Sequence, residues 1–311
     1  MKTSGIIRIV AGTLVAAVLI WILASVLSGK TVLHTHGGIY TMGRSIFEDS
    51  SKMVASSSGT AAVADVREIK IQWAVGQVKI QRGTGTEITF TETCARKLTD
   101  KETMRYSIEN GKLHIAYSES GLQALNLIGL PEKNLTVTVP ASSELSFQEI
   151  QVETASAELL IQDVQAEKID LESASGYILT ENISAEKLEA SAISGKIDMK
   201  NFTAEKLDVG TTSGRVTMQG KAAQVDIEAV SGDTELQLDN VPAKLDMEAV
   251  SGSINIIVPE SADGFSAEVT TVSGNFRCEH PSVQNGQRYV VGAGKGEFEC
   301  NTVSGNITIG K

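Results

Sequence analysis

In the C-terminal half of the chain, apolar and polar residues alternate in short stretches, and the alternation changes phase at each Ser-Gly dipeptide. If the serine is position 0, apolar residues occupy −6 and −4 before it and +3 and +5 after it, as Leu188 and Ile197 do around Ser194. An alternation with a period of two is typical of strands that bury one face. If the alternation shifted by one residue within a straight strand, the apolar side chains after the shift would point to solvent. The phase change therefore predicts a corner at Ser-Gly, where glycine supplies backbone freedom.

The Ser-Gly dipeptide also recurs along the chain, at steps of 19, 19, 18, 20, 22 and 31 residues. The predicted corners are Ser175, Gly176, Ser194, Gly195, Ser213, Gly214, Ser231, Gly232, Ser251, Gly252, Ser273, Gly274, Ser304 and Gly305. A unit that recurs at a nearly fixed period is typical of stacked repeats. Two strands and their corners in about 20 residues predict an all-β fold, a parallel single-chain β-solenoid. An antiparallel sandwich is the structural alternative, but it does not explain why identical positions recur at the same phase.

A weaker form of the pattern extends upstream, around Ser156 and around Val75. Between these units, the turn signal Asn110-Gly111 predicts a hairpin of residues 104–108 and 113–117. We interpret the recurring phrase Ala-Glu-Lys as the return corner of each coil; it lies at residues 166–168, 185–187 and 204–206. The predicted solenoid is residues 63–311, with irregular N-terminal coils and the hairpin over 63–155 and regular repeats over 156–311.

The N-terminal region predicts a membrane anchor. Residues 9–27 form an uncharged apolar run of 19 residues, long enough to cross a bilayer as one transmembrane helix. A cleaved signal peptide is the alternative, although its apolar core is usually shorter. We expect a single-pass protein of the cell membrane, with residues 1–8 in the cytoplasm and the C-terminal domain outside it. Residues 28–62 are rich in small polar residues and predict a flexible linker. His34 and His36 within it form only a weak candidate metal site, because they have no carboxylate or thiol nearby.

The charge of the chain is concentrated on one predicted face. The formal net charge of −11 makes nucleic acid and anionic lipid surfaces poor partners. Position −5 is acidic in all seven units, and the alternation places it outward. Its residues are Asp170, Glu189, Asp208, Asp226, Asp246, Glu268 and Glu299. Stacked at one coil spacing, neighbouring carboxylates repel by about 1 kcal/mol in a water-like dielectric.

Lysine at position −7 offers the simplest compensation for this repulsion. The lysines on the same outer face are Lys168, Lys187, Lys206 and Lys244. The first interpretation is a solvated ladder of exposed ion pairs, each of which contributes little. The alternative is a linear site for divalent cations or cationic peptides, best placed near Glu268 and Glu299, where position −7 carries no lysine.

The sequence contains no recognisable catalytic constellation. It has four histidines, and no Gly-x-Ser-x-Gly elbow surrounds the repeated serines, which cannot all be nucleophiles. No phosphate-binding glycine loop or thiol-pair metal motif is present. We therefore expect no enzyme activity, no cofactor and no small-molecule substrate.

The three cysteines are too few for a disulfide framework. Cys278 and Cys300 both fall on inward positions of successive units, whereas Cys94 lies outside the regular repeats. A disulfide between Cys278 and Cys300 and a pair of buried thiols both fit this placement.

Several phrases resemble a known family. Val137–Pro140 reads Val-Thr-Val-Pro, residues 249–256 read Ala-Val-Ser-Gly-Ser-Ile-Asn-Ile, and residues 302–309 read Thr-Val-Ser-Gly-Asn-Ile-Thr-Ile. Together they resemble the bacterial putative-adhesin family of β-strand-repeat proteins, a domain of unknown function, over roughly residues 64–311. The resemblance implies a β-solenoid at the cell envelope, with some members linked to envelope stress. It implies no catalytic residues, and the family name describes a fold and not a demonstrated activity.

These observations lead to two functional hypotheses. The first is a membrane-anchored, extracytoplasmic solenoid with a binding, adhesion-like or envelope-stress-sensing role. The second is a scaffold without a ligand of its own, which docks an envelope protein or a second copy through an open C-terminal coil. That coil is expected to be open because the chain stops two residues after Ile309, the last inward position.

Overall fold

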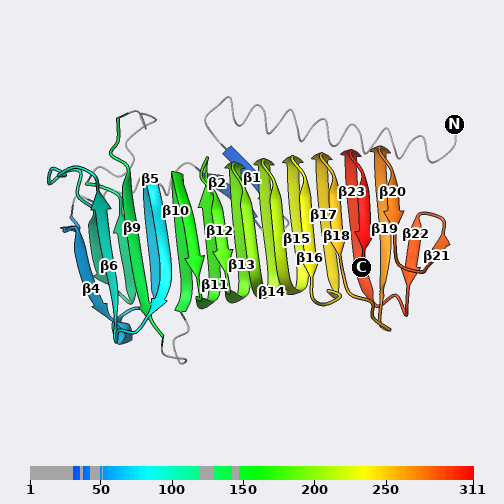
Figure 1. Ribbon diagram of the computed structural model, residues 1–311, viewed down its shortest axis with the longest axis horizontal. Helices are drawn as coiled ribbons and strands as arrows, with labels where there is room; N and C mark the ends of the chain where they lie inside the picture. Colours follow the sequence, from blue (N-terminus) through cyan, green and yellow to red (C-terminus); the bar gives the residue numbers. More distant parts are fainter. Residues whose placement is uncertain (1–30, 36–37, 43–49, 51, 120–128, 142–146) are drawn as a thin grey trace.

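The computed structural model describes residues 31–35, 38–42, 50, 52–119, 129–141 and 147–311. A sheet of 22 strands winds into a solenoid (Figure 1), while β1 (Thr31–Thr35) and β2 (Gly38–Met42) form a separate antiparallel pair. The expected membrane helix, residues 9–27, lies outside the described residues. Within the described ranges no helix is long and apolar enough to span a bilayer, and a single 3-10 turn, η1 (Val63–Asp65), is present.

Each regular coil consists of two strands joined at a Ser-Gly corner, and neighbouring coils pair in parallel, with one register shift between Lys200 and Phe202. Ser194, Ser213 and Ser231 lie opposite one another in three successive coils. The strands are β11 (Gln165–Ser173), β12 (Ile178–Glu181), β13 (Ser184–Ser194), β14 (Ile197–Ser213), β15 (Val216–Ser231), β16 (Thr234–Leu238), β17 (Lys244–Ser251) and β18 (Ile254–Ile257). The predicted parallel β-solenoid is confirmed for this region.

The interior contains the side chains that the alternation assigned to it. Leu188 at −6 and Ile197 at +3 are both fully buried, as are their counterparts in most coils. The upstream units follow the same phase in β5 (Glu68–Gly83) and β10 (Phe147–Gln162), where Val75 lies opposite Ser156. Burying one such Leu or Ile side chain contributes about 1.5–3 kcal/mol, so this repeated face is the main source of stability.

The Ser-Gly corners bring the backbones of neighbouring coils into close contact. A Cβ atom added to Gly232 would lie 1.9 Å from the carbonyl oxygen of Gly214, and one added to Gly252 would lie 2.0 Å from that of Gly232. The φ angle of Gly232 is also +130°, a conformation that L side chains rarely adopt. Glycine at the corner is therefore required by the neighbouring coil as well as by its own backbone.

The return corners differ from the expectation. The phrase Ala-Glu-Lys lies inside strands β11, β13 and β14, and the chain turns a few residues earlier. The turning residues are Asp163, Asn182 and Asn201, with φ angles of 57°, 55° and 52°. Their side chains form a ladder, with Asn182 donating to Asp163 at 2.9 Å and Asn201 to Asn182 at 3.1 Å. Asn and Asp tolerate this left-handed conformation, so they make the return corner.

At the C-terminal end, the order of coils in space differs from their order in the chain. The last coil, β23 (Gly296–Ser304) and β24 (Ile307–Gly310), pairs on one side with β17 and β18. On the other side it pairs with β19 (Phe265–Ser273) and β20 (Phe276–Cys278). In Figure 1 the red strand β23 accordingly lies between β17 and β19. The expectation of an open C-terminal coil is wrong, because this coil is paired on both edges.

The distal end is formed instead by the preceding coil and a hairpin. Strands β21 (Ser282–Asn285) and β22 (Arg288–Val291) pair with each other, and β22 pairs antiparallel with β19. The hairpin covers the edge of β19 over Phe265–Glu268 and extends the stack at its far end (Figure 1).

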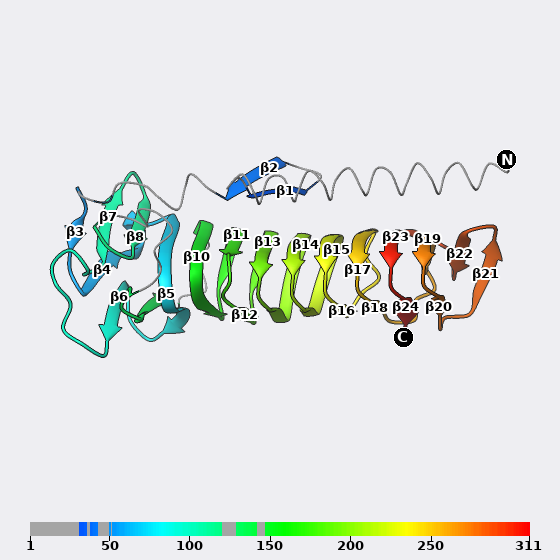
Figure 2. The same ribbon diagram turned by 90° about the horizontal axis from the view of Figure 1, so that it is seen from above.

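At the N-terminal end, too, the order of strands in space differs from their order in the chain. Strand β5 enters the solenoid first, yet it lies between β10 and the pair β8 (Lys112–Ala116) and β9 (Lys133–Pro140). The predicted hairpin is confirmed as β7 (Arg105–Glu109) and β8. Strand β6 (Glu87–Cys94) pairs antiparallel with β9. Figure 2 shows that this cap is broader than the row of regular coils.

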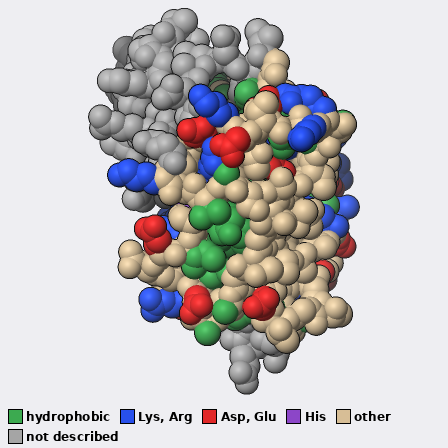
Figure 3. Space-filling view, turned by 90° about the vertical axis from the view of Figure 1, so that its left-hand side faces the viewer, with side chains coloured by type: hydrophobic (Ala, Val, Ile, Leu, Met, Phe, Trp, Pro, Cys, Tyr) green, Lys and Arg blue, Asp and Glu red, His purple; other side chains and the backbone are tan. Residues whose placement is uncertain are grey.

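Part of the expected linker belongs to this cap. Strand β3 (Val54–Ala55) pairs with β7, and β4 (Ser58–Ala62) pairs with β6. Residues 54–55 and 58–62 are therefore strands of the cap and not flexible linker. Seen end-on in Figure 3, apolar side chains show at the centre of the cap, and charged side chains surround them.

Replacing a corner glycine tests the close contact. We expect Gly232→Ala to destabilise the solenoid by about 3 kcal/mol, through the clash with Gly214 and the strained φ angle. For a domain of this size that lowers the Tm by about 6–12 °C, measured by circular dichroism during heating. Gly85→Ala is the control, because its added Cβ has no neighbour closer than 3.7 Å. Equal Tm values for the two variants would contradict the contact.

Candidate functional site

The acidic residues at position −5 form one continuous column on the outside of the solenoid. Register places Asp170, Glu189 and Asp208 opposite one another in successive coils. The full column, in spatial order, is Asp170, Glu189, Asp208, Asp226, Asp246, Glu299 and Glu268. We call the face that carries positions −7, −5, −3 and −1 the outer wall. The structure thus brings all seven predicted residues together, with the order of the last two exchanged by the inserted C-terminal coil.

Lysines at −7 pair with these carboxylates within a coil and between coils. Lys168 Nζ lies 3.0 Å from Asp170 Oδ2 and 2.9 Å from Glu189 Oε2. Lys206 Nζ lies 2.9 Å from Asp208 Oδ2. The interpretation as a ladder of ion pairs is confirmed for this stretch. Asp170, Glu189 and Asp208 are only 5–7 % exposed, so these pairs are more enclosed than the predicted solvated ladder.

The compensation weakens in the next coils. Gln224 takes the place of lysine beside Asp226, and Glu228 adds a second carboxylate at position −3. Burial and, to a smaller extent, the nearby Asp226 and Glu248 carboxylates raise the pKa of Glu228 to about 7. Burial, with Asp208 and Asp246, also raises the pKa of Asp226. Position −7 of this coil supplies no lysine, so Asp226 and Glu228 face other carboxylates with less compensation than Asp170 or Asp208 has.

At position −1 of the outer wall, a column of mostly aliphatic side chains runs parallel to the acidic column. Its members from β13 onward, in spatial order, are Ile193, Thr212, Val230, Val250, Val303 and Val272. They are partly exposed, and Val272 is 53 % exposed. The outer wall therefore offers adjacent rows of carboxylates and aliphatic groups, a pattern that fits a partner with alternating basic and apolar side chains.

The structure gives no support for a metal site in this column. Among the described residues, no group of three or more His, Cys, Asp or Glu side chains is arranged to hold a metal ion. Glu268 and Glu299, the preferred position for a cation, are neighbours in register and both exposed. The side chains of His34 and His36, the weak candidate metal site in the linker, lie outside the described part of the structure.

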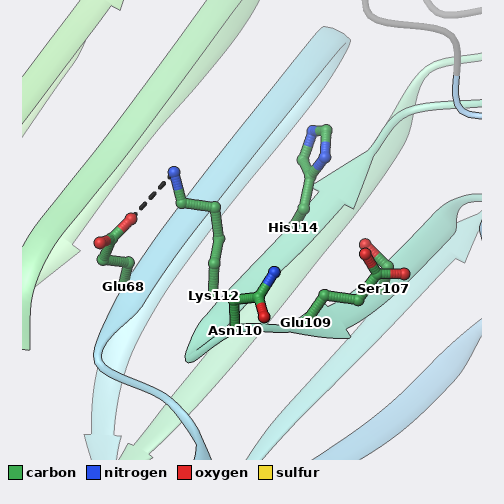
Figure 4. Close-up of a pocket in the computed structure, with 6 residues that line it drawn as sticks. All are labelled: Glu68, Ser107, Glu109, Asn110, Lys112 and His114. Atoms are coloured by element: carbon green, nitrogen blue, oxygen red, sulfur yellow. Dashed lines mark ion pairs between the residues drawn. The ribbon is translucent and has the colours of Figure 1, made fainter.

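A shallow polar groove lies where the outer wall meets the N-terminal cap (Figure 4). It has a volume of about 400 Å³ and is lined by Glu68, Ser107, Glu109, Asn110, Lys112 and His114. Lys112 Nζ pairs with Glu68 at 2.9 Å, and His114 Nε2 lies 2.9 Å from Gln72 Oε1. Lys112 Nζ and His114 Nε2 thus already contact protein groups, and the groove continues the outer wall into the cap.

The remaining predicted residues take structural places. The corner serines, such as Ser194 and Ser231, are exposed at the ridge between the two strands. Cys94, Cys278 and Cys300 are all free thiols. The structure does not form the alternative disulfide between Cys278 and Cys300: Cys278 is half-buried opposite Ile309, and Cys300 is buried opposite Val269.

The sequence analysis missed a buried ion pair in the cap. Lys133 is fully buried, and its Nζ lies 2.7 Å from Glu92 Oε2 and 2.6 Å from the carbonyl oxygen of Glu102. The ammonium group also lies 3.9 Å from the ring centroid of Tyr117 and 5.0 Å from that of Trp73. Glu92 accepts a further hydrogen bond from the backbone of Met104. This cluster ties the loops of the cap to the first coil.

Breaking this pair tests how far the cap depends on it. We expect Lys133→Met to cost about 3–5 kcal/mol, because it leaves the Glu92 carboxylate buried without a cation. The double variant Lys133→Met/Glu92→Gln removes both charges and should recover at least half of the lost Tm. Both are measured by thermal unfolding. A double variant no more stable than the single one would show that the charge pair is not the cause.

The raised pKa of Glu228 predicts a pH-dependent stability. The folded-state pKa lies above the ordinary value of 4.5, so the folded protein favours the protonated carboxyl. That stabilising effect is complete below pH 4.5 and is lost as the pH rises through about 7. Glu228→Gln should therefore raise the Tm by about 2 °C at pH 8.5, roughly 1 kcal/mol for a domain of this size, and leave it nearly unchanged at pH 5.

The matched control for this measurement is Glu235→Gln. Glu235 is exposed and lies on β16, away from the acidic column. It should shift the Tm at neither pH. A gain for Glu228→Gln that is equally large at pH 5 and pH 8.5 would contradict the assignment.

Comparisons with known proteins support the architecture. A family profile described as Toastrack DUF4097 matches residues 66–310, and a search of curated proteins gives no significant match. A solved "putative lipid binding protein" from Parabacteroides distasonis is 16% identical with a TM-score of 0.50, and the match covers 82% of this chain and 96% of that chain. A "putative adhesin" from Parabacteroides merdae is 15% identical with a TM-score of 0.43, covering 82% and 96%. At 16% identity, the likeness to the protein from Parabacteroides distasonis shows the fold alone.

Proposed function

We propose, from the premise that the chain belongs to the Toastrack DUF4097 family, that it is a binding protein of the cell envelope and not an enzyme. The apolar run of residues 9–27 holds it in the membrane, and the solenoid lies outside the cytoplasm in an adhesion-like or sensing role. Its ligand is a cationic protein segment, and the binding surface is the outer wall.

One observation carries this proposal: the carboxylates at position −5 remain in register through seven coils beside a partly exposed aliphatic column. Around Asp226 and Glu228 the charge has less compensation from lysine, and the pKa values are raised. A partner that supplies positive charge there relieves a repulsion already present in the free protein. Such charge complementarity favours both rapid encounter and choice of partner.

The charge also argues against a lipid as the ligand. The solved protein with a TM-score of 0.50 is named a putative lipid binding protein. An anionic lipid surface would face the carboxylates of the outer wall and be repelled. The scaffold hypothesis in its original form depends on an open C-terminal coil, and it is not retained because that coil is paired on both edges.

The test compares two sets of three neutralising substitutions in the full chain in detergent micelles. The wall variant is Asp226→Asn/Glu228→Gln/Asp246→Asn. The matched control, Asp198→Asn/Asp233→Asn/Glu235→Gln, removes the same number of carboxyl groups from the other arm of the coils, and both variants are compared at pH 8.5, where Glu228 is ionised. The probe is a fluorescent 12-residue peptide of alternating Lys and Val, followed by fluorescence anisotropy. We expect the wall variant to weaken binding at least tenfold and the control less than about twofold. Equal weakening by both variants would mean attraction to net charge alone and would contradict the proposal.

A further inference from the structure

The last coil of the chain fills a gap between two coils that precede it in sequence. We call this gap, between β17–β18 and β19–β20, the terminal slot. Cys300 in β23 lies opposite Met247 on one side of the slot and opposite Val269 on the other. All three residues occupy position −4, so both sides of the slot present the same phase of the repeat to the coil between them.

Further contacts secure the coil within the terminal slot. The ring of Phe298 stacks on Phe265, with centroids 4.4 Å apart and planes 3° from parallel. His280 is buried, and its Nε2 lies 2.8 Å from the carbonyl oxygen of Gly310. Lys311 Nζ pairs with Glu260 at 2.6 Å. These partners lie in residues 260–280, so the slot holds its occupant through pairing, stacking and an ion pair at the chain end.

The connection into the slot is short and rich in glycine. Only residues 292–295 separate β22 from β23. Gly292 and Gly294 have φ angles of +58° and +69°. A short connection with such conformations is strained for other residues, and glycines at a hinge absorb large changes of backbone angle. The last coil, which follows this hinge, can therefore pack into the terminal slot of its own chain or extend away from it.

The last coil is an inner layer of the stack, although it comes last in the chain. Residues 265–291 lie one layer beyond the slot, yet they precede the last coil in sequence. Without residues 296–310, the coils β17–β18 and β19–β20 would each present an unpaired edge of matching register. Every contact that fills the slot can be made equally by the same segment of another chain, which is the condition for exchange of an identical element between protomers.

We propose that the terminal slot also accepts the C-terminal coil, residues 296–311, of a second copy of this chain, and that reciprocal exchange produces a dimer. The interface inside each slot is then the same as in the monomer. The balance between the two forms depends on protein concentration and on the strain of the hinge at residues 292–295. The proposal is independent of what the outer wall binds.

A disulfide across the slot distinguishes the two forms. Parallel neighbours are about 4.8 Å apart, within the Cα range of disulfides. In a Cys94→Ser/Cys278→Ser background of the full chain in detergent, the substitution Met247→Cys places a thiol opposite the native Cys300. Two preparations with different tags are mixed, warmed, cooled and oxidised.

The two forms give different products in this experiment. Monomers give an internal bond, whereas exchanged dimers give a covalent dimer that carries both tags and is identified on a non-reducing gel. Mass spectrometry of the linked peptides then establishes whether the bond joins position 247 to Cys300. We call this bond the slot disulfide.

The hinge provides a matched pair of variants. Gly292→Ala strains the closed hinge and its added Cβ lies 2.9 Å from the carbonyl oxygen of Ala262, so it should raise the exchanged fraction about tenfold. Gly286→Ala has a similar φ angle of +67° but has no neighbour within 4 Å and lies in the hairpin tip. It should leave the fraction unchanged.

The exchange is expected to increase with protein concentration during warming. Covalent dimers that carry both tags and the slot disulfide, and that increase in Gly292→Ala alone, support the proposal. Internal bonds only, at every concentration and in both hinge variants, would overturn it. Dimers that lack the slot disulfide would also overturn it, because they would arise from another surface.

Discussion

The contact between stacked corner glycines is the constraint on which the rest of the structure depends. The carbonyl oxygen of one glycine occupies the place where a Cβ of the next would lie, as between Gly214 and Gly232. This closeness fixes each coil directly above its neighbour, and the turn it permits changes the phase of the alternation. Both strands of a coil can then bury their apolar side chains. Register, core and the straight row of coils in Figure 1 follow from this one contact.

Strict register also determines the chemistry of the surface. A residue type that repeats in sequence becomes a continuous column in space, so seven acidic residues at −5 become seven adjacent carboxylates. The protein offsets much of the repulsion with lysines such as Lys168 and Lys206. Where Gln224 replaces lysine, this compensation is missing from position −7. Burial and the neighbouring carboxylates raise the pKa values of Asp226 and Glu228 there, as they also raise that of Glu172. The proposed binding surface is thus a consequence of stacking combined with a local change in sequence.

The features that the sequence could predict are those carried by the repeat. The inward positions, the Ser-Gly corners and the acidic column are local in each unit, and all lie where the period places them. The inserted C-terminal coil was not predictable, because pairing of β23 with β17 and β19 depends on contacts between distant segments. The ion pair of Lys133 and Glu92 joins residues far apart in an irregular region. The return corners had a signal, Asp163, Asn182 and Asn201 at equal spacing, which the more conspicuous Ala-Glu-Lys phrase obscured.

The insertion of the C-terminal coil as an inner layer is the central structural claim, and hydrogen exchange tests it directly. Amide exchange is followed by mass spectrometry on peptides that cover residues 244–257, 282–291 and 296–310. Because β23 and β24 are hydrogen-bonded on both edges, residues 296–310 should exchange as slowly as 244–257, and the exposed hairpin at 282–291 should exchange first. If residues 296–310 exchange as fast as the hairpin, the C-terminal coil is an open end and the claim is wrong.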